Sequence, residues 1–186
     1  MFKQVIFTSA LAVLTACSAT PSRLDMSQAS SPLTLRAAVS SAMVRTVSLP
    51  TYAAAEEVSF ETEDGLIISN GDVLWADDPA RAVTLSIART MGDILNADIG
   101  PDPWPFVGLP DVAIDIRIAR MITNAQGTFE LQGQYFIGGD GIDYPRTSTA
   151  FDISKPLTSE GTIGIADAQA RAIVTLAEDI ARKISR

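Results

Sequence analysis

Residues 111–137 have the sequence DVAIDIRIARMITNAQGTFELQGQYFI, which contains the clearest strand pattern of the chain. Apolar and polar residues alternate through 111–120 and again through 128–137, as in strands that bury one face and leave the other in water. The alternating apolar residues are Val112, Ile114, Ile116, Ile118, Phe129, Leu131, Tyr135 and Ile137. The polar connection at 123–127 has the length of a hairpin loop, so the two strands are predicted to pair antiparallel.

Segments on both sides of this hairpin add a third strand, around 146–153, and two helices. Asp77-Asp78-Pro79 combines acidic capping residues with proline at the first helical position, which predicts a helix from about 79 to 96. Apolar residues recur there every three or four positions and give one apolar stripe. The same spacing from Ala166 to Ile184 predicts a C-terminal amphipathic helix.

Shorter strands are expected before the first helix. The pattern predicts a strand at 41–49, a helical turn near 53–57, an extended stretch at 58–61, and two brief strands at 66–68 and 73–75. A turn at Asn70-Gly71 is expected to join the last two. The predicted fold is therefore α+β, with a mixed, largely antiparallel sheet and two amphipathic helices packed on one face.

The N-terminus has the features of a secretory signal peptide at 1–16. Lys3 precedes an apolar stretch of about ten residues, too short to span a bilayer as a helix. The stretch ends in LTAC at 14–17, which resembles the lipobox of bacterial lipoproteins. On that resemblance, cleavage falls between Ala16 and Cys17, and the Cys17 thiol receives a diacylglyceryl group. The alternative is a buried core cysteine. The signal peptide, the lipobox and the single cysteine of the chain, however, coincide at one place.

Three parts follow along the chain. Residues 1–16 are the predicted signal peptide, and 17–40 hold the acylated cysteine and a flexible tether rich in Ser, Ala, Thr and Pro. Residues 41–186 are predicted to form one periplasmic α+β domain. Several acyl chains on Cys17 would make the membrane anchor effectively permanent.

Composition excludes several classes of function. The chain has 186 residues, a formal net charge of −8, no histidine and one cysteine. An acidic surface repels phosphate backbones, which argues against nucleic-acid binding. The absence of histidine removes His-dependent catalysis and His-ligated zinc, and a single cysteine forms no internal disulfide. No cofactor, no metal and no enzymatic activity are predicted.

Several motifs together resemble a known family. They are VSLPTY at 47–52, WADDP at 75–79, PWP at 103–105, PDVAID at 110–115 and the alanine-rich helix at 166–184. Their order and spacing, with the lipobox, are similar to those of the ABC-type transport auxiliary lipoproteins, the PqiC-like group of membrane-integrity-associated transporter subunits.

The resemblance implies a role rather than a reaction. Such lipoproteins are similar to components that work beside an MCE-type (mammalian-cell-entry-like) or paraquat-inducible-type transporter in the inner membrane. The resemblance implies docking on its periplasmic part from the outer membrane, with several copies assembled into a ring. Ser18 after the cysteine, by similarity to lipoprotein sorting in Gram-negative bacteria, also points to the outer membrane.

Five residues are candidates for a partner interface: Trp75, Trp104, Tyr52, Asp115 and Arg117. Tryptophans often anchor interfaces, although both could instead cap the open ends of the core. Asp115 and Arg117 share the wet face of one strand, where a partner or only solvent could meet them.

Other polar features have simpler explanations. Asp77 and Asp78 are expected to cap a helix rather than to act as an acid–base pair. The carboxylates of Glu61, Glu63 and Asp64 lack the ligand ladder of a calcium loop. The glycine-rich run at 138–141 is expected to be a turn rather than a phosphate loop, because no helix follows it.

Two functions remain open from the sequence. The first is a non-catalytic auxiliary lipoprotein of an envelope ABC/MCE-type lipid transport system, anchored on the periplasmic face of the outer membrane. The alternative is a lipoprotein that binds a lipid or small hydrophobic ligand on its own, between the sheet and the helices.

Overall fold

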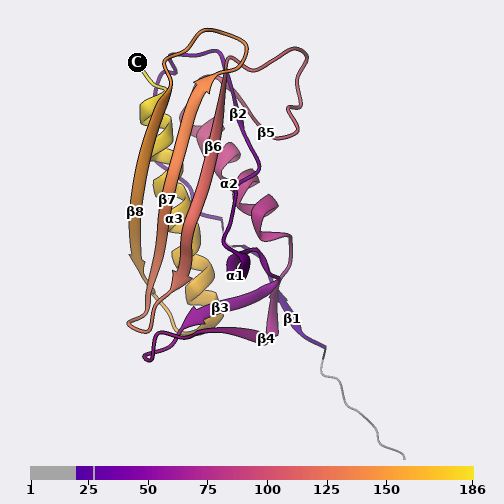
Figure 1. Ribbon diagram of the computed structural model, residues 1–186, viewed down its shortest axis with the longest axis vertical. Coiled ribbons are helices and arrows are strands. Elements are labelled where there is room, and N and C mark those ends of the chain that lie inside the picture. The colour runs from indigo at the N-terminus through magenta and orange to yellow at the C-terminus, as the bar shows by residue number, and fades with distance from the viewer. Residues whose placement is uncertain (1–19, 27) are drawn as a thin grey trace, which may run out of the picture.

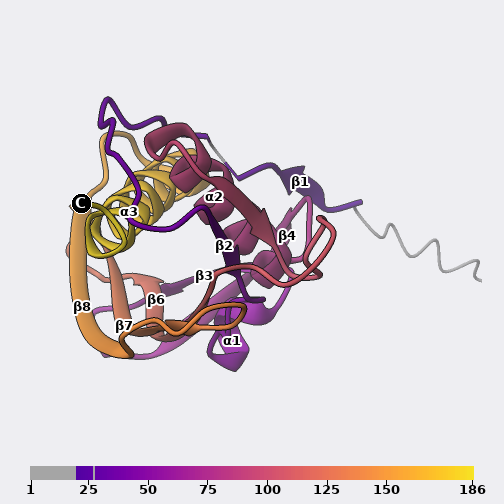
Figure 2. The same ribbon diagram turned by 90° about the horizontal axis from the view of Figure 1, so that it is seen from above.

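Three long strands run side by side along the long axis of the molecule (Figure 1). They are β6 (Val112–Thr123), β7 (Thr128–Gly139) and β8 (Thr147–Pro156), and both ladders between them are antiparallel. Helices α2 (Pro79–Ile94) and α3 (Gly161–Lys183) lie together on one side of these strands (Figure 2).

The computed structural model describes residues 20–26 and 28–186, and shorter elements complete it. These elements are β1 (Ser22–Leu24), β2 (Ser41–Val44), α1 (Thr51–Ala54), β3 (Glu57–Glu61), β4 (Ile67–Trp75) and β5 (Asp98–Pro101).

The sheet branches at β6. One edge of β6 pairs with β7 along its length, while the other edge pairs with β2 near its start and with β3 at Thr123. Beyond β2 lies β5, and beyond β3 lie β4 and β1. The pairings of β1, β2 and β5, and the single bridge from β3 to β6, are parallel. The predicted α+β class, with a mixed, largely antiparallel sheet, is confirmed, and the short helix α1 lies two residues before the helical turn that was predicted near 53–57.

The core lies between the three long strands and the two helices. Its fully buried side chains come from alternate strand positions and from the helical stripes: Ile114, Ile116, Leu131, Tyr135, Ile87, Met91, Leu176 and Ile180. Each such large apolar side chain contributes about 1.5–3 kcal/mol relative to an exposed one. The Tyr135 hydroxyl donates to Asp179 Oδ2 of α3 at 2.7 Å, which ties the sheet to that helix, and burial raises the pKa of Tyr135.

A β-bulge at Ala119 changes which residues of β6 face outward. Ile118 pairs with Gly133 of β7, but the next paired residue is Arg120, opposite Gln132. A bulge of this kind leaves one residue unpaired and reverses the alternation beyond it. Arg120 is therefore carried to the outer face of the sheet instead of into the core.

The turn predicted at Asn70-Gly71 is wrong. Strand β4 continues through both residues and pairs antiparallel with β3, with a register shift between Glu57 and Val58. The Asn70 side chain accepts the Asp72 N–H at 2.9 Å, a local Asx contact inside the strand. The predicted turn at Asp64-Gly65 does reverse the chain, and Gly65 has the positive φ (76°) that favours glycine.

The free tether predicted over 17–40 is wrong for its described part. Strand β1 pairs with β4, and the following residues lie along the groove between α2 and α3. Ser31 Oγ donates to Glu178 Oε1 at 2.5 Å, and the Ala37 N–H donates to Asn96 Oδ1 at 2.9 Å. These hydrogen bonds, and the packing of Leu24, Met26, Leu33 and Leu35 against the core, hold the segment on the domain.

The start of α2 provides a test of local helix stability. Asp78 Oδ1 accepts the Arg81 N–H at 2.8 Å, and Pro79 occupies the first helical position, as predicted. Asp78→Ala is expected to lower the free energy of unfolding by about 1 kcal/mol, because one helix-terminal N–H loses its acceptor. Urea denaturation measures this, and Asp78→Asn should keep most of the stability. An Asp78→Asn loss as large as that of alanine would contradict the capping role.

Candidate functional site

The largest exposed apolar side chains at one end of the molecule belong to the loop between β5 and β6. We call residues 102–111 the distal loop, because it lies at the end opposite β1 (Figure 1). Val107 is fully exposed, Leu109 is 70% exposed and Phe106 is 49% exposed. Ile142, from the β7–β8 connection, is 46% exposed. Exposed apolar side chains gathered in one place usually mark an interaction site.

The base of the distal loop folds back onto β5. A Cβ on Gly100 would lie 2.7 Å from Pro105 Cδ and 2.9 Å from Trp104 Cζ3, so this close approach requires glycine. The Trp104 and Phe106 rings meet edge to face with their centroids 4.9 Å apart. The Trp104 Nε1–H is buried and has no hydrogen-bond partner within the described residues. Trp104 thus supports the loop from beneath while Val107 and Leu109 project from it.

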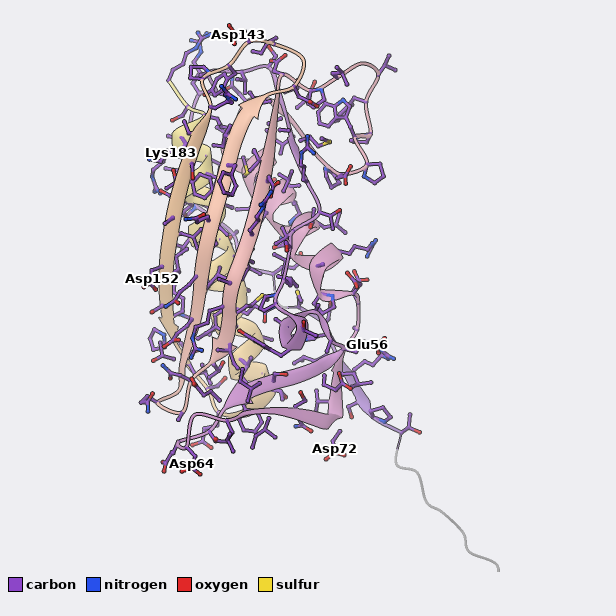
Figure 3. All side chains as sticks on the ribbon, in the orientation of Figure 1. Glu56, Asp64, Asp72, Asp143, Asp152 and Lys183 are labelled. Carbon is purple, nitrogen blue, oxygen red and sulfur yellow. The ribbon has the colours of Figure 1, made fainter. Side chains whose placement is uncertain are left out.

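Backbone contacts hold the distal loop and the neighbouring β7–β8 connection together. The Gly141 N–H donates to the Pro110 carbonyl at 2.7 Å, and the Asp140 N–H donates to the Asp111 carbonyl at 3.0 Å. Asp111 Oδ2 in turn accepts the Ser40 N–H at 2.7 Å. The same end of the molecule is marked by Asp143 in Figure 3. The exposed apolar residues therefore stand on an anchored base.

A polar feature lies on the face of the sheet that the two long helices do not cover. Arg117 Nε and Nη2 donate to the two carboxylate oxygens of Asp115 at 3.1 and 3.0 Å. The guanidinium carbon lies 5.2 Å from the Phe136 ring centroid. The Arg117 hydrogen bonds lower the pKa of Asp115, and the same bonds raise the pKa of Arg117. The pair is preorganised, but it is open to solvent, where an ion pair contributes little to stability.

A third cluster joins β3, β6 and β7. Arg120 donates to Glu130 and to Glu61, and Asn124 Nδ2 donates to Glu130 Oε1 at 2.7 Å. The three charged side chains are only 21–30% exposed. The Arg120 hydrogen bond is the main cause that lowers the pKa of Glu130. This cluster links three strands, because the one arginine of β6 bonds to a carboxylate of β3 and to a carboxylate of β7.

Removing Arg120 is expected to have a pH-dependent cost. Arg120→Ala leaves two half-buried carboxylates unpaired and should lower the free energy of unfolding by about 2 kcal/mol at pH 7. The folded pKa of Glu130 lies below its ordinary value of 4.5, so the stabilisation is present above that value and is lost as pH falls through the folded pKa. The difference between wild type and variant should therefore shrink below pH 4.5.

Denaturation in urea at several pH values measures this difference. Arg182→Ala is the matched control, because its pair with Glu178 is half-exposed and should change stability by less than about 0.5 kcal/mol. A cost for Arg120→Ala that stays constant down to pH 3 would show that lost packing, and not lost charge, is the cause.

The predicted interface residues lie in different surroundings. Trp75 is 6% exposed and belongs to the core, which removes it from the candidate interface. Tyr52 is half-buried, and its hydroxyl accepts the Met121 N–H at 3.2 Å. Trp104 lies in the distal loop, and Asp115 and Arg117 form the ion pair on the open face. Ala16 and Cys17, the predicted cleavage and acylation site, lie outside the described residues.

Sequence reasoning missed the most exposed residues of the distal loop and Ile142. Phe106, Val107 and Leu109 fall between prolines in PWPFVGLP, a run without helical or strand periodicity. Apolar residues without periodicity, flanked by prolines, are a usable signal of a loop that exposes them.

Three of the acidic residues considered above for acid–base or calcium chemistry have other partners. Asp78 caps α2, Asp77 pairs with Arg81, and Glu61 pairs with Arg120. Within residues 20–26 and 28–186, no three acidic, histidine or cysteine side chains come close enough to hold a metal ion. In the same part of the chain, no helix combines the length and the apolar character that crossing a bilayer requires.

Comparison with solved structures supports the fold. A crystal structure of an uncharacterised protein matches with a TM-score of 0.68 at 17% identity, over 90% of this chain and 100% of that one. A crystal structure of a protein from Xanthomonas campestris, assigned to family DUF330, matches with a TM-score of 0.63 at 14% identity, over 86% of this chain and 92% of that one. At these identities the likeness shows the fold alone.

Comparison of the sequence with protein families gives the relationship. No curated protein matches the chain. The family described as "ABC-type transport auxiliary lipoprotein component" matches residues 23–181, which include all the long strands and nearly all of both long helices. The earlier resemblance is thereby confirmed: this chain belongs to the family of ABC-type transport auxiliary lipoprotein components.

Proposed function

We propose that this protein is a non-catalytic subunit that connects an MCE-type ABC lipid transporter to the outer membrane. In this proposal the signal peptide is removed before Cys17, the acylated cysteine holds the protein on the periplasmic face of the outer membrane, and the distal loop docks on the transporter. The observation that carries the proposal is the exposed apolar group of Phe106, Val107 and Leu109 on an anchored base.

The arrangement of the two ends supports this role. Strand β1, where the described chain begins, lies at one end of the molecule and the distal loop at the other (Figure 1). A twelve-residue strand such as β7 spans about 40 Å. A lipid anchor close to β1 would therefore present the distal loop to the periplasm, at a distance from the membrane that holds the anchor.

The electrostatics favour binding over catalysis. The carboxylates with a perturbed pKa, Asp115 and Glu130, are each lowered chiefly by an arginine that hydrogen bonds to them. A general acid or base near neutral pH needs the opposite shift, from burial or a like charge. The exposed apolar side chains of the distal loop instead resemble the centre of a protein interface, where charged residues are depleted.

The alternative of a ligand held between sheet and helices is not favoured. That space is filled by the core, and the cavity that Tyr52, Trp75 and Ile165 line there has a volume of about 20 Å³. Small-molecule pockets usually have volumes of about 300–1,000 Å³. Native mass spectrometry of the purified protein would reveal a bound lipid in addition to the covalent acyl chains if this alternative were correct.

Photo-crosslinking in the native host tests the proposed docking. A photoreactive benzoylphenylalanine at Val107 is expected to crosslink to an MCE-domain subunit or to its permease, identified by mass spectrometry. The same group at Ala150, which is exposed on β8 opposite Gln134 of β7, is the control. Equal crosslinking from both positions, or none from Val107, would remove the distal loop as the docking site.

The proposal includes assembly of several copies into a ring. Native mass spectrometry of the acylated protein should then give one fixed stoichiometry above the monomer. A monomer at all micromolar concentrations would contradict this part alone and leave the docking test unaffected.

A further inference from the structure

A second group of exposed apolar side chains lies at the end of the molecule that contains β1. Four of them belong to the β3–β4 hairpin, and the fifth stands in the first turn of α3. We call this group the proximal patch, and its members are Phe60, Leu66, Ile67, Ile68 and Ile163, which are 37–68% exposed. Strands β3 and β4 cross this end below the long strands (Figure 1).

The hairpin that carries the proximal patch is well formed. Phe60 pairs with Ile68 and Glu61 with Ile67, and the Thr62 N–H donates to the Leu66 carbonyl at 2.8 Å. A hollow of about 430 Å³ beside the hairpin is lined by Phe60, Leu157 and Ile165 together with polar residues of β3 and of the β6–β7 turn. The apolar side chains are therefore held in place on a paired hairpin, and they are not the tip of an unpaired loop.

The chain outside the described strands ties this end to the membrane anchor. Strand β1 begins at Ser22, five residues after Cys17. Five residues span at most about 18 Å when fully extended. Strand β1 is fixed to β4 by the register of Ser22 with Val73, and Arg23 Nη1 donates to the Trp75 carbonyl at 3.0 Å. An acyl chain on Cys17 would therefore hold Ser22 of β1 within about 18 Å of the bilayer, at the same end of the molecule as β3 and β4.

We propose that the proximal patch rests on the same bilayer that holds Cys17, so that the protein stands upright on its membrane. This inference depends on the acylation of Cys17 in the function proposed above. It adds a protein surface to the lipid anchor and fixes the direction in which the distal loop points.

The charges around the proximal patch select the type of bilayer. Glu63, Asp64 and Asp72 are exposed carboxylates on the same hairpin, and Figure 3 shows Asp64 and Asp72 at this end. Anionic lipid headgroups would repel them. We therefore assign the patch to a zwitterionic phospholipid surface, into which the hairpin inserts at the level of the headgroups, with Phe60 and Ile68 on one of its faces and Ile67 on the other.

The test places one fluorescent label at either end of the acylated, full-length mature protein in phosphatidylcholine vesicles. Cys17 is the only cysteine and its thiol carries the lipid, so a label reacts only with an introduced cysteine. An environment-sensitive nitrobenzoxadiazole label on Ile68→Cys should shift its emission to the blue and gain intensity severalfold when vesicles are added. Spin-labelled lipids should quench it. The same label on Val107→Cys should show neither change.

Three results would overturn the inference, and each has a different meaning. A label at residue 68 that stays in water, while intact mass and vesicle flotation confirm the acylated anchor, removes the membrane contact but keeps the anchor. Protection of residue 68 without vesicles, rising with protein concentration, means that a second copy covers the patch. An unacylated Cys17 removes the proposed anchor and this inference together.

Discussion

Gly133→Ala is expected to lower the free energy of unfolding by about 3 kcal/mol. Gly133 lies on the helix-facing side of β7, opposite the bulge in β6. A Cβ there would lie 2.2 Å from the Arg117 carbonyl oxygen, 2.8 Å from Phe151 Cζ and 3.0 Å from Ile118 Cα. Two of these three atoms belong to the backbone, so the strand itself would have to move. Urea denaturation of the purified domain measures the loss.

Gly138 of the same strand provides the matched control. A Cβ at Gly138 would meet only Arg146 Cγ, at 3.6 Å, which is an ordinary van der Waals contact. Gly138→Ala is therefore expected to change the free energy of unfolding by less than about 0.5 kcal/mol, or to stabilise slightly by restricting the unfolded chain. Equal losses from the two variants would mean that the cost comes from strand propensity and not from the close approach.

A substitution at Phe151 distinguishes between the two contacts that a Cβ at Gly133 would make. Phe151→Leu in the Gly133→Ala background relieves the contact with the ring but leaves the contact with the Arg117 carbonyl. The coupling energy between the two substitutions should be favourable but should recover less than half of the loss caused by alanine. Complete recovery would show that the ring, and not the bulge backbone, sets the requirement for glycine.

The same region shows how far the sequence predicts this fold. The alternation through 111–120 and 128–137 predicts the β6–β7 hairpin correctly, because side-chain period and burial agree along both strands. The bulge at Ala119 was not predicted, although the apolar positions change phase between Ile118 and Met121. That change of phase is the trace of the bulge in the sequence. The bulge places Arg120 opposite Gln132 and within hydrogen-bond distance of Glu61 and Glu130.

Elements that depend on distant partners could not be predicted from local pattern. Strands β1 and β5 have three and four residues, and each exists through parallel pairing with a strand far along the chain. The residues next to a short strand in the sequence contain no information about such a distant partner. The Asn70-Gly71 pair shows the converse error, because a sequence typical of a hairpin turn lies inside a strand that its neighbour β3 extends.

The candidate site was predicted only in part for the same reason. Trp75 and Trp104 were named as possible interface anchors, with capping of the core as the alternative, and in the fold Trp75 belongs to the core while Trp104 supports a loop. Whether Phe106, Val107 and Leu109 face solvent depends on where the loop base is fixed. Gly100 and Asp111 fix it through contacts that only the folded chain brings together.

Replacing two apolar residues of the distal loop with aspartate is expected to abolish capture of the transporter subunit without unfolding the protein. The double variant Val107→Asp, Leu109→Asp places carboxylates where an interface would remove water. Each unpaired carboxylate buried at an interface costs at least about 1–3 kcal/mol, so capture should fall by about 100-fold or more. Because both side chains are largely exposed, the free energy of unfolding should change by less than about 0.5 kcal/mol.

The control carries the same charge on a different surface. Ser148→Asp, Ala150→Asp adds two carboxylates at exposed positions of β8, so it reproduces any general effect of a more acidic protein. Affinity capture from crosslinked cells compares the variants with wild type, and an envelope-permeability assay in the native host reports the consequence. Loss of capture only in the loop variant localises the docking surface. Ser148 and Ala150 lie across β7 from Asp115 and Arg117 on the open face of the sheet, so equal loss of capture from both variants would mean that this face, or the overall charge of the protein, also governs the association.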